Sequence, residues 1–190
     1  NKLNTLLLEQ RPDIVHFHNI YHQLTPALIG VAKRFGCKTV LTAHDYKIVC
    51  PSYTMLRDGH VCDDCLTGSV SNAFRHRCQQ GDTFKSLLLS LEAYWQKFAQ
   101  NYAMLDCIIA PSEFMRQTLL RKLPRSRIDV IVNGIDASTT IPGDTAGDYF
   151  LYIGRLSREK GVATLALAQQ KMQQSMPLKI VGDGPLGSDL

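Results

Sequence analysis

Short runs of β-branched and apolar residues alternate along the chain with stretches in which apolar residues recur every three or four positions. Strands are predicted at residues 12–19, 37–45, 105–112 and 127–136, and helices at residues 25–36 and 113–123. Gly36 is a stop signal for the first of these helices, and Ser112 is an N-cap for the second. Strands that alternate with helices predict an α/β fold, with a parallel sheet covered on both faces.

The longest helical pattern runs from about residue 83 to residue 105. Its apolar members recur at steps of three and four residues and are Phe84, Leu87, Leu88, Leu91, Tyr94, Trp95, Phe98 and Tyr102. An apolar stripe of this width predicts a helix face that is buried in the protein. The alternative is a face that contacts an acceptor or a membrane.

The composition changes between Asp136 and Asp148 to small and polar residues, with Ile141 as the one large apolar residue. Such a segment indicates a loop or a linker between domains. After it, residues 149–154 and 178–184 predict strands and residues 162–174 predict a helix. The sequence therefore predicts a first domain over residues 1–136, a linker over 137–148 and the start of a second domain over 149–190.

Composition excludes several classes of protein. Of the 190 residues, 45% are hydrophobic and 20% are charged, which excludes collagen, a coiled coil and general disorder. The net charge of +4 suits an anionic ligand or membrane surface without requiring either. No apolar run approaches the ~20 residues that cross a bilayer, and the first residues do not resemble a secretory signal. Because the chain begins with Asn1, we expect a fragment of a longer protein.

Polar groups follow two predicted strands at the point where each strand ends. His16 and His18 close the strand at 12–19, and His44 with Asp45 closes the strand at 37–45. Ligands of open α/β sheets bind beyond the carboxyl ends of the strands. For His16 we favour a hydrogen-bonded structural role. For His44 we favour a catalytic role, because Asp45 and His18 gather at the same sheet edge.

The segment GRLSREKG joins a predicted strand to a predicted helix. Gly154 and Arg155 directly follow the strand, and Lys160 and Gly161 directly precede the helix. A residue without a side chain lets the backbone approach a ligand, the helix N-terminus offers free N–H groups, and Arg and Lys add full positive charges. These groups suit a diphosphate and can stabilise it as a leaving group without a metal ion. The alternative is a charged surface turn.

The closing VGDGP is a second glycine-rich turn after a strand. Gly182 and Gly184 either allow close approach to a nucleotide or make a tight turn. The chain contains neither the GxGxxG dinucleotide motif nor the GxxxxGK[ST] phosphate loop. Hydride transfer and ATP hydrolysis therefore lack their usual sequence signatures.

Four of the six cysteines lie in an insertion over about residues 50–78 that shows little helical or strand periodicity. They are spaced C-x11-C-x2-C-x12-C and are Cys50, Cys62, Cys65 and Cys78. A CxxC pair flanked by two further thiols can close a tetrahedral structural zinc site, for which His60 and His76 are spare ligands. Unligated thiols and disulfides are the alternatives. Cys37 and Cys107 lie in or next to strands and are expected to be small buried residues.

The order of the segments resembles glycosyltransferase family 4, whose members are retaining enzymes of the GT-B fold. The segments that carry the resemblance are DIVHFHN, VLTAHD, IIAPSEFMRQTL, IDVIVNGID, YFLYIGRLSREKGV and LKIVGDGP. The NGID element before the linker and the GR-x4-KG element after it make the resemblance specific. It implies two Rossmann-like domains that face a cleft. The first would bind mainly the acceptor, and the second mainly a nucleotide-sugar donor such as a UDP- or GDP-sugar.

The resemblance also implies roles for particular residues. Arg155 and Lys160 match the family's diphosphate-binding pair, and His44 matches the histidine near the donor sugar. It implies that no catalytic metal is needed, and some members carry a similar cysteine-rich insertion. The family's glycine-rich first strand and its later Glu-x7-Glu motif are expected outside these residues. We therefore expect the 190 residues alone to show no transferase activity.

The leading hypothesis is a retaining hexosyltransferase that uses a saccharide or lipid-linked acceptor in glycan or cell-envelope polysaccharide biosynthesis. We expect it in the cytoplasm, with peripheral contact at the inner face of the membrane as a further expectation. One alternative is a zinc-stabilised nucleic-acid-binding module. No nucleic acid is expected, however, because Arg57, Arg75 and Arg77 are offset by Asp58, Asp63 and Asp64. Another alternative is a different GT-B enzyme, a phosphorylase or an epimerase.

Overall fold

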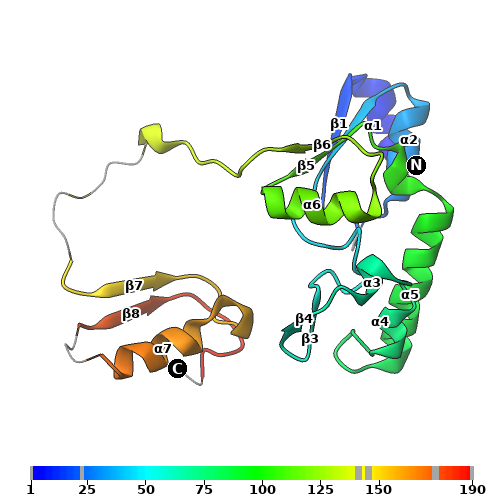
Figure 1. Cartoon of the computed structure of the whole chain (residues 1–190). Helices are drawn as coiled ribbons and strands as arrows, with labels where there is room; N and C mark the ends of the chain where they lie inside the picture. Colours follow the sequence, from blue (N-terminus) through cyan, green and yellow to red (C-terminus); the bar gives the residue numbers. More distant parts are fainter. Residues whose placement is uncertain (1, 22–23, 140–142, 144–146, 173–175, 189–190) are drawn as a thin grey trace. The chain divides into compact units, whose positions relative to one another are not determined.

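The chain divides into two compact units, Asn1–Gly134 and Ile135–Leu190, in a computed structural model (Figure 1). The structure describes residues 2–21, 24–139, 143, 147–172 and 176–188. Each unit is considered by itself. Within the described residues, no helix has both the length and the apolar character needed to cross a membrane.

A four-stranded parallel sheet forms the centre of the first unit. Its strands lie in the order β1 (Ile14–His18), β2 (Lys38–Thr42), β5 (Cys107–Ala110) and β6 (Ile128–Val130). All three strand pairs are parallel. The parallel sheet confirms the predicted α/β fold class and is consistent with a Rossmann-like domain of the GT-B type.

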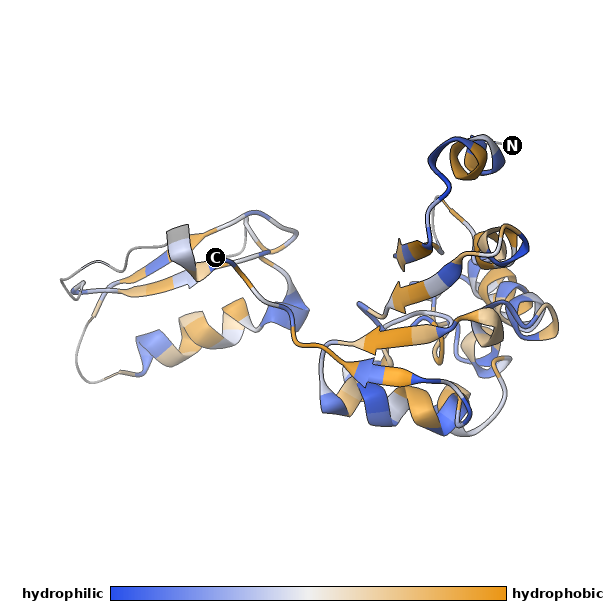
Figure 2. Ribbon diagram, turned by 90° about the horizontal axis from the view of Figure 1, so that it is seen from above, coloured by the Kyte–Doolittle hydropathy of each residue, from blue (hydrophilic) through white to orange (hydrophobic). Residues whose placement is uncertain are grey.

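Helices flank this sheet in two groups. Figure 1 shows α1 (Lys2–Gln10) and α2 (Ala27–Arg34) beside β1, and α6 (Glu113–Lys122) beside β5 and β6. Hydrophobic residues concentrate on the sheet, while the helices alternate between hydrophobic and hydrophilic turns (Figure 2). The sequence analysis assigned no element to α1. One turn of α1 buries Leu7 in the core.

Two apolar clusters make up the core of the first unit. One joins α1 and α2 to β1 and β2 through residues such as Phe17 and Ile29. The other joins α6 to β5 and β6 through residues such as Ile108 and Leu119. Ile48 and Leu105 pack against both clusters, so the two parts of the core are continuous.

Local signals act at the helix ends as the sequence predicts. Gly36 has a φ of 82°, a conformation that glycine adopts easily and that ends α2. The hydroxyl of Ser112 accepts a hydrogen bond of 3.2 Å from the N–H of Met115 and so caps α6. Both predicted signals are confirmed.

The partly buried carboxylate of Asp106 joins α2 to the sheet. Both oxygens of Asp106 accept hydrogen bonds of 2.9 Å from the ammonium group of Lys33, and one accepts a bond of 2.7 Å from the N–H of Thr39. The bond from Lys33, followed by the bond from Thr39, lowers the pKa of Asp106 to about 2. The carboxylate is therefore ionised over the whole physiological range, and this attachment does not depend on pH there.

The long helix α5 (Thr83–Phe98) ends earlier than predicted. Gln100 adopts a left-handed conformation with a φ of 53°, which interrupts the helical pattern, and the short 3-10 helix η1 (Asn101–Met104) follows. Tyr102, the last member of the predicted apolar stripe, lies in η1 and packs against the first core cluster. The pattern of apolar residues continues through this break, so the sequence alone does not show where α5 ends.

The prediction that the apolar stripe of α5 is buried is wrong. Phe84, Trp95 and Phe98 are 68%, 61% and 81% exposed. The buried residues of α5 are instead Ser86, Ser90 and Gln96. This helix therefore turns its polar side toward the protein and its apolar side outward.

Hydrogen bonds explain why the serine face of α5 packs inward. The hydroxyl of Ser86 accepts a hydrogen bond of 3.0 Å from the N–H of Gln79, and that of Ser90 donates to the carbonyl oxygen of Val70 at 3.1 Å. Small side chains allow close approach, and these bonds satisfy the buried hydroxyl groups. A count of apolar positions does not detect such a contact.

The insertion contains more regular structure than its sequence suggested. It forms a hairpin of β3 (Leu56–Arg57) and β4 (His60–Val61), followed by α3 (Asp64–Thr67) and α4 (Asn72–Arg75). The hairpin turns at Asp58 and Gly59, which have φ values of 51° and 82°. An Asp-Gly turn of this kind is typical of two-residue hairpins. Each element is too short to produce a detectable period.

The second unit forms a β-α-β arrangement, as predicted. Its parallel strands are β7 (Phe150–Ile153) and β8 (Leu178–Val181), and between them lie the 3-10 helix η3 (Arg158–Lys160) and α7 (Val162–Gln170). The 3-10 helix η2 (Ala137–Thr139) lies in the predicted linker. Ile141 in that linker, and the end of the helix predicted at 162–174, lie outside the described residues.

The two cysteines outside the insertion differ in burial. Cys37 is 4% exposed and lies in the first core cluster, which confirms its predicted role as a small buried residue. Cys107 is half-buried at the start of β5, and its thiol donates to the carboxylate of Asp129 at 3.5 Å. For Cys107 the predicted burial is therefore only partly confirmed.

Candidate active site

Three histidines meet at the carboxyl edge of the sheet. In the parallel register His18 lies beside Thr42, so that His44, two residues further on, emerges at the same edge. The ring nitrogens His18 Nδ1 and His44 Nε2 are 2.8 Å apart. His16 Nε2 lies 2.8 Å from the hydroxyl of Thr42, and the rings of His16 and His18 are 4.3 Å apart between centroids. The structure thus brings together the histidines that the sequence placed at this edge.

The histidine cluster disfavours additional positive charge. Desolvation lowers the pKa of His16 below its ordinary value of 6.5, and the charges of His18 and His44 lower it further. In the hydrogen bond between His18 and His44, one ring donates and the other accepts, so at least one of the two bonded nitrogens carries no proton. The hydrogen bond therefore requires at least one of these two rings to be neutral, and such a ring can orient a polar ligand.

Asp45 and Lys47 continue the polar group next to His44. Asp45 accepts a hydrogen bond of 2.9 Å from the N–H of Lys47, but burial raises the pKa of its carboxyl group above the ordinary value. The ammonium group of Lys47 donates to the carbonyl oxygen of Pro51 at 3.0 Å and to the carboxylate of Glu92 at 2.7 Å. The side chain of Lys47 is only 8% exposed, so this ion pair is largely shielded from water.

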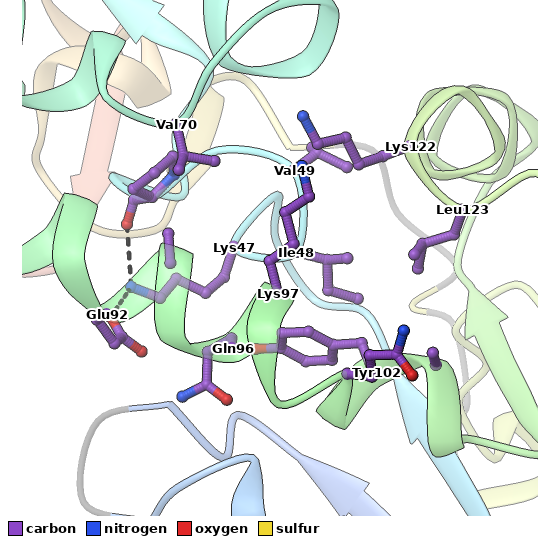
Figure 3. A pocket seen from close by; sticks show the side chains of 14 residues that line it. Lys47, Ile48, Val49, Val70, Glu92, Gln96, Lys97, Tyr102, Lys122 and Leu123 are labelled. Atoms are coloured by element: carbon purple, nitrogen blue, oxygen red, sulfur yellow. Dashed lines mark hydrogen bonds and ion pairs between the residues drawn. The ribbon is translucent and has the colours of Figure 1, made fainter.

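A cavity of about 240 Å³ lies between α5, the segment after β2 and the end of α6. Figure 3 shows Lys47 in its wall, directed at Glu92, with Lys97 and Lys122 among its other lining residues. Lys47, Ile48 and Tyr102 also line the small hollow that contains His44 and Asp45. Sequence reasoning missed this cavity because three segments far apart in the chain form its walls.

The basic segment of the second unit lies at the start of α7. Leu156 and Ser157 are buried, whereas Arg155 and Lys160 are exposed. Gly161, with a φ of 70°, connects η3 to α7. Both basic side chains lie close to Glu159: its pKa is lowered first by the hydroxyl of Ser157 and, more weakly, by the charges of Arg155 and Lys160. The structure therefore places the two predicted diphosphate ligands on one loop.

The glycines of the second unit bring the loops after β7 and β8 together. The N–H of Gly154 donates to the carbonyl oxygen of Val181 at 3.0 Å. A Cβ atom on Gly182 would overlap the carbonyl oxygen of Gly154, and one on Gly184 would overlap the carbonyl oxygen of Leu156. These glycines therefore allow two backbone segments to approach each other closely.

The parallel sheet and its flanking helices are consistent with a Rossmann-like domain, and comparison with known proteins identifies its family. Residues 1–139 match the sequence profile of Glycosyltransferase Family 4. This match covers more than half of the 190 residues, and the chain belongs to that family. The predicted resemblance is confirmed.

One curated relative is similar to part of the chain. The alpha-maltose-1-phosphate synthase of Mycolicibacterium smegmatis is 29% identical to it over an alignment of 97 residues, and the match covers 42% of this chain and 25% of that protein. The aligned part thus spans about a quarter of the relative's length.

The lowered pKa of His16 gives a test of the histidine cluster. We expect NMR titration of the full-length protein to give a pKa for His16 below 6.5. The substitution His18→Gln should raise it, because one neighbouring positive charge is removed. The same shift means that His16 reduces stability as the pH falls below about 6.5, because the unfolded chain then binds the proton more readily.

The exposed His60, on β4, provides the control for this titration. The substitution His60→Gln should leave the pKa of His16 unchanged. A pKa for His16 at or above 6.5, or one that does not respond to His18→Gln, would contradict the arrangement of the three rings.

Proposed function

We propose that the protein is a retaining glycosyltransferase. It moves a hexose-type unit from a nucleotide-diphosphate sugar to a saccharide or lipid-linked acceptor in the biosynthesis of glycans or cell-envelope polysaccharide. Membership of glycosyltransferase family 4 supports the transferase class. The observation that carries the proposal is the pair of exposed basic side chains, Arg155 and Lys160, between β7 and α7.

The loop after β7 suits the diphosphate of a UDP- or GDP-sugar. The first turn of α7 offers backbone N–H groups and a partial positive charge, and Arg155 can bind phosphate oxygens through two N–H groups at once. Gly154 and Gly184 keep the loops after β7 and β8 free of side chains at their closest approach. Lys160 supplies a second full charge, so that the loop itself can neutralise a diphosphate without a catalytic metal.

In the proposed reaction an acceptor oxygen forms a bond to the anomeric carbon of the donor sugar. The bond between that carbon and the diphosphate oxygen breaks, and the nucleoside diphosphate leaves with the electron pair. The acceptor hydroxyl transfers its proton to an oxygen of the departing diphosphate, and the new bond forms on the face from which the diphosphate leaves. Arg155 and Lys160 stabilise the negative charge that develops on the leaving group.

We assign to His44 the contact with the donor sugar. Its hydrogen bond to His18 fixes the orientation of its ring, which is what a sugar-binding imidazole needs. The cavity of about 240 Å³ beside it supports an acceptor with an apolar part. Lys97 and Lys122 in the lining of that cavity suit a phosphate group attached to such a lipid.

Arg155→Ala and Lys160→Ala test the donor site. In the full-length protein we expect each substitution to weaken the binding of UDP or GDP by about 1.5 to 3 kcal/mol, because each removes a charge-assisted hydrogen bond. Titration calorimetry measures this loss. Arg158→Ala removes a positive charge from the same loop and is the matched control, for which we expect little change. If Arg155→Ala and Lys160→Ala bind UDP or GDP no more weakly than Arg158→Ala does, Arg155 and Lys160 do not bind the diphosphate.

The alternative classes have less support. Arg57 is paired with Asp64 at 3.0 Å and Arg121 with Asp63 at 3.2 Å, which weakens the positive field that nucleic acid would need. A phosphorylase would release a sugar phosphate and an epimerase an isomerised sugar. Analysis of the product from labelled donor separates both from a transferase.

The outward apolar face of α5 supports peripheral contact with a membrane. Phe84, Trp95 and Phe98 lie on this face and are largely exposed. Lys85, an exposed basic residue of the same helix, can contact anionic headgroups. Aromatic side chains with nearby basic groups are typical of helices that lie in the interface of an anionic bilayer.

Vesicle binding tests this contact. We expect the full-length protein to sediment with vesicles that contain an anionic phospholipid. The double substitution Trp95→Ser with Phe98→Ser should reduce binding about tenfold or more, because two apolar side chains no longer enter the lipid. Phe114 on α6 is also 68% exposed, so Phe114→Ser is the matched control. If Trp95 is shielded from a soluble quencher before vesicles are added, another part of the protein covers α5 and the proposal is wrong.

A further inference from the structure

The segment after β2 carries His44 but has no regular secondary structure. Residues 43–50 form neither a helix nor a strand. Ala43 is still attached to the sheet, since its N–H donates to the carbonyl oxygen of Ile109 at 2.9 Å. Beyond His44, a loop of this kind depends on contacts with other elements to keep one conformation.

Lys47 connects this loop to α5. Its backbone N–H donates to the carboxylate of Asp45, next to His44, at 2.9 Å. Its ammonium group donates to the carbonyl oxygen of Pro51 at 3.0 Å and to the carboxylate of Glu92, on α5, at 2.7 Å. One residue thus bonds to two points of the loop and to a helix that lies far along the chain.

Lys47 also faces the segment that follows β1. Its Nζ lies 6.0 Å from the centre of the Tyr21 ring, a distance at which a cation is attracted to an aromatic face. Tyr21 and Lys47 line the same small hollow as His44 and Asp45. Strand β1 ends at His18, whose ring is bonded to that of His44. Lys47 therefore lies against both of the segments whose histidines form this bond.

The ion pair of Lys47 and Glu92 is shielded from water. The side chain of Lys47 is only 8% exposed, and Figure 3 shows it directed at Glu92 in the wall of the cavity. An ion pair in such surroundings is held firmly, because loss of one partner leaves a charge that is costly to bury. Since Glu92 compensates its charge, Lys47 is suited to fixing the loop rather than to binding an anionic ligand.

The neighbours of Lys47 are fixed by the core. Lys47, Ile48 and Tyr102 line both the cavity beside α5 and the hollow that contains His44. Ile48 packs against both core clusters, and Tyr102 packs against the first. The loop that carries His44 is therefore held by the core on one side and by Glu92 on the other.

We propose that Lys47, through its ion pair with Glu92, is a positioning residue that holds His44 in the orientation needed to contact the donor sugar. Lys47 acts through Asp45 and the loop and does not itself touch the sugar. This inference rests on the proposed function, in which His44 makes that contact. Because a misplacement of about 1 Å can slow an enzymatic step about a hundredfold, loss of the ion pair lowers kcat.

The substitution Lys47→Met tests this role by kinetics, because it removes the charge and keeps an unbranched side chain. In the full-length protein, with UDP-glucose or GDP-mannose and an alkyl glycoside, we expect kcat for release of the nucleoside diphosphate to fall about tenfold or more. Calorimetry should show unchanged affinity for UDP or GDP, since Arg155 and Lys160 bind the diphosphate. Lys47→Arg can still pair with Glu92 and should retain most of kcat.

The histidine ring signals give a second measurement, which needs no activity. The bond between His18 and His44 favours one tautomer of each ring, and the ¹⁵N chemical shifts of the ring nitrogens report the tautomers. In Lys47→Met we expect these shifts to move toward those of a mixture of tautomers. If Lys47→Met does not fold, Glu92→Gln, which keeps an oxygen acceptor, replaces it in both measurements and should change them in the same direction.

Lys33→Met is the matched control. It also removes an ammonium group from an ion pair, that with Asp106 at 2.9 Å, but Asp106 precedes β5 and so lies at the opposite edge of the sheet from His44. We expect it to leave kcat and the ring signals of His18 and His44 unchanged. Unchanged ring signals in Lys47→Met, or an equal change in Lys33→Met, would overturn the positioning role.

The two measurements also separate this inference from the proposed function. If the wild-type protein releases no nucleoside diphosphate from either donor, the transferase proposal fails, and the ring signals alone decide whether Lys47 orients His44. If the wild-type protein is active and Lys47→Met has the same kcat, the positioning role fails while the transferase proposal stands.

Discussion

Parallel strand pairing is the constraint on which both units depend. Because parallel strands end at the same edge of a sheet, the residues that follow them meet there although they are far apart in the sequence. In the first unit this pairing brings His18 next to His44. In the second it brings the loop after β7 against the loop after β8, and only glycine at positions 182 and 184 permits so close an approach. His44 follows β2 and Arg155 follows β7, so both lie at these edges.

The sequence predicted the parts of the fold that depend on local signals. Strand-forming runs, the Ser112 cap and the stop at Gly36 each act through neighbouring residues, and each is confirmed. The prediction of a buried apolar face was wrong for α5, because Ser86 and Ser90 form hydrogen bonds to Gln79 and Val70 on the polar side of the helix. The short elements of the insertion and the cavity beside His44 depend on contacts between distant segments. The periodicity of apolar residues along the chain does not reveal such contacts.

The candidate site residues also divide into those that local sequence signals indicate and those that depend on contacts between distant segments. The roles of His44, Arg155 and Lys160 depend on their places at strand and helix ends, which a sequence pattern can show. The zinc site expected from the spacing of Cys50, Cys62, Cys65 and Cys78 stays a prediction, and as the side chains stand, no three His, Cys, Asp or Glu residues in the described part of the chain are arranged to hold a metal ion. The insertion follows the strand that carries His44, and Lys122 connects it to α6.

The stereochemistry of transfer is the most direct test of the central claim, that the protein uses an activated sugar whose diphosphate is the leaving group. The full-length protein would be incubated with UDP-glucose or GDP-mannose, both α-configured, and a panel of alkyl glycosides. NMR would then assign the anomeric configuration of the product. The account predicts release of the nucleoside diphosphate and an α-linked product. A β-linked product, or a sugar phosphate in place of the nucleoside diphosphate, would contradict it.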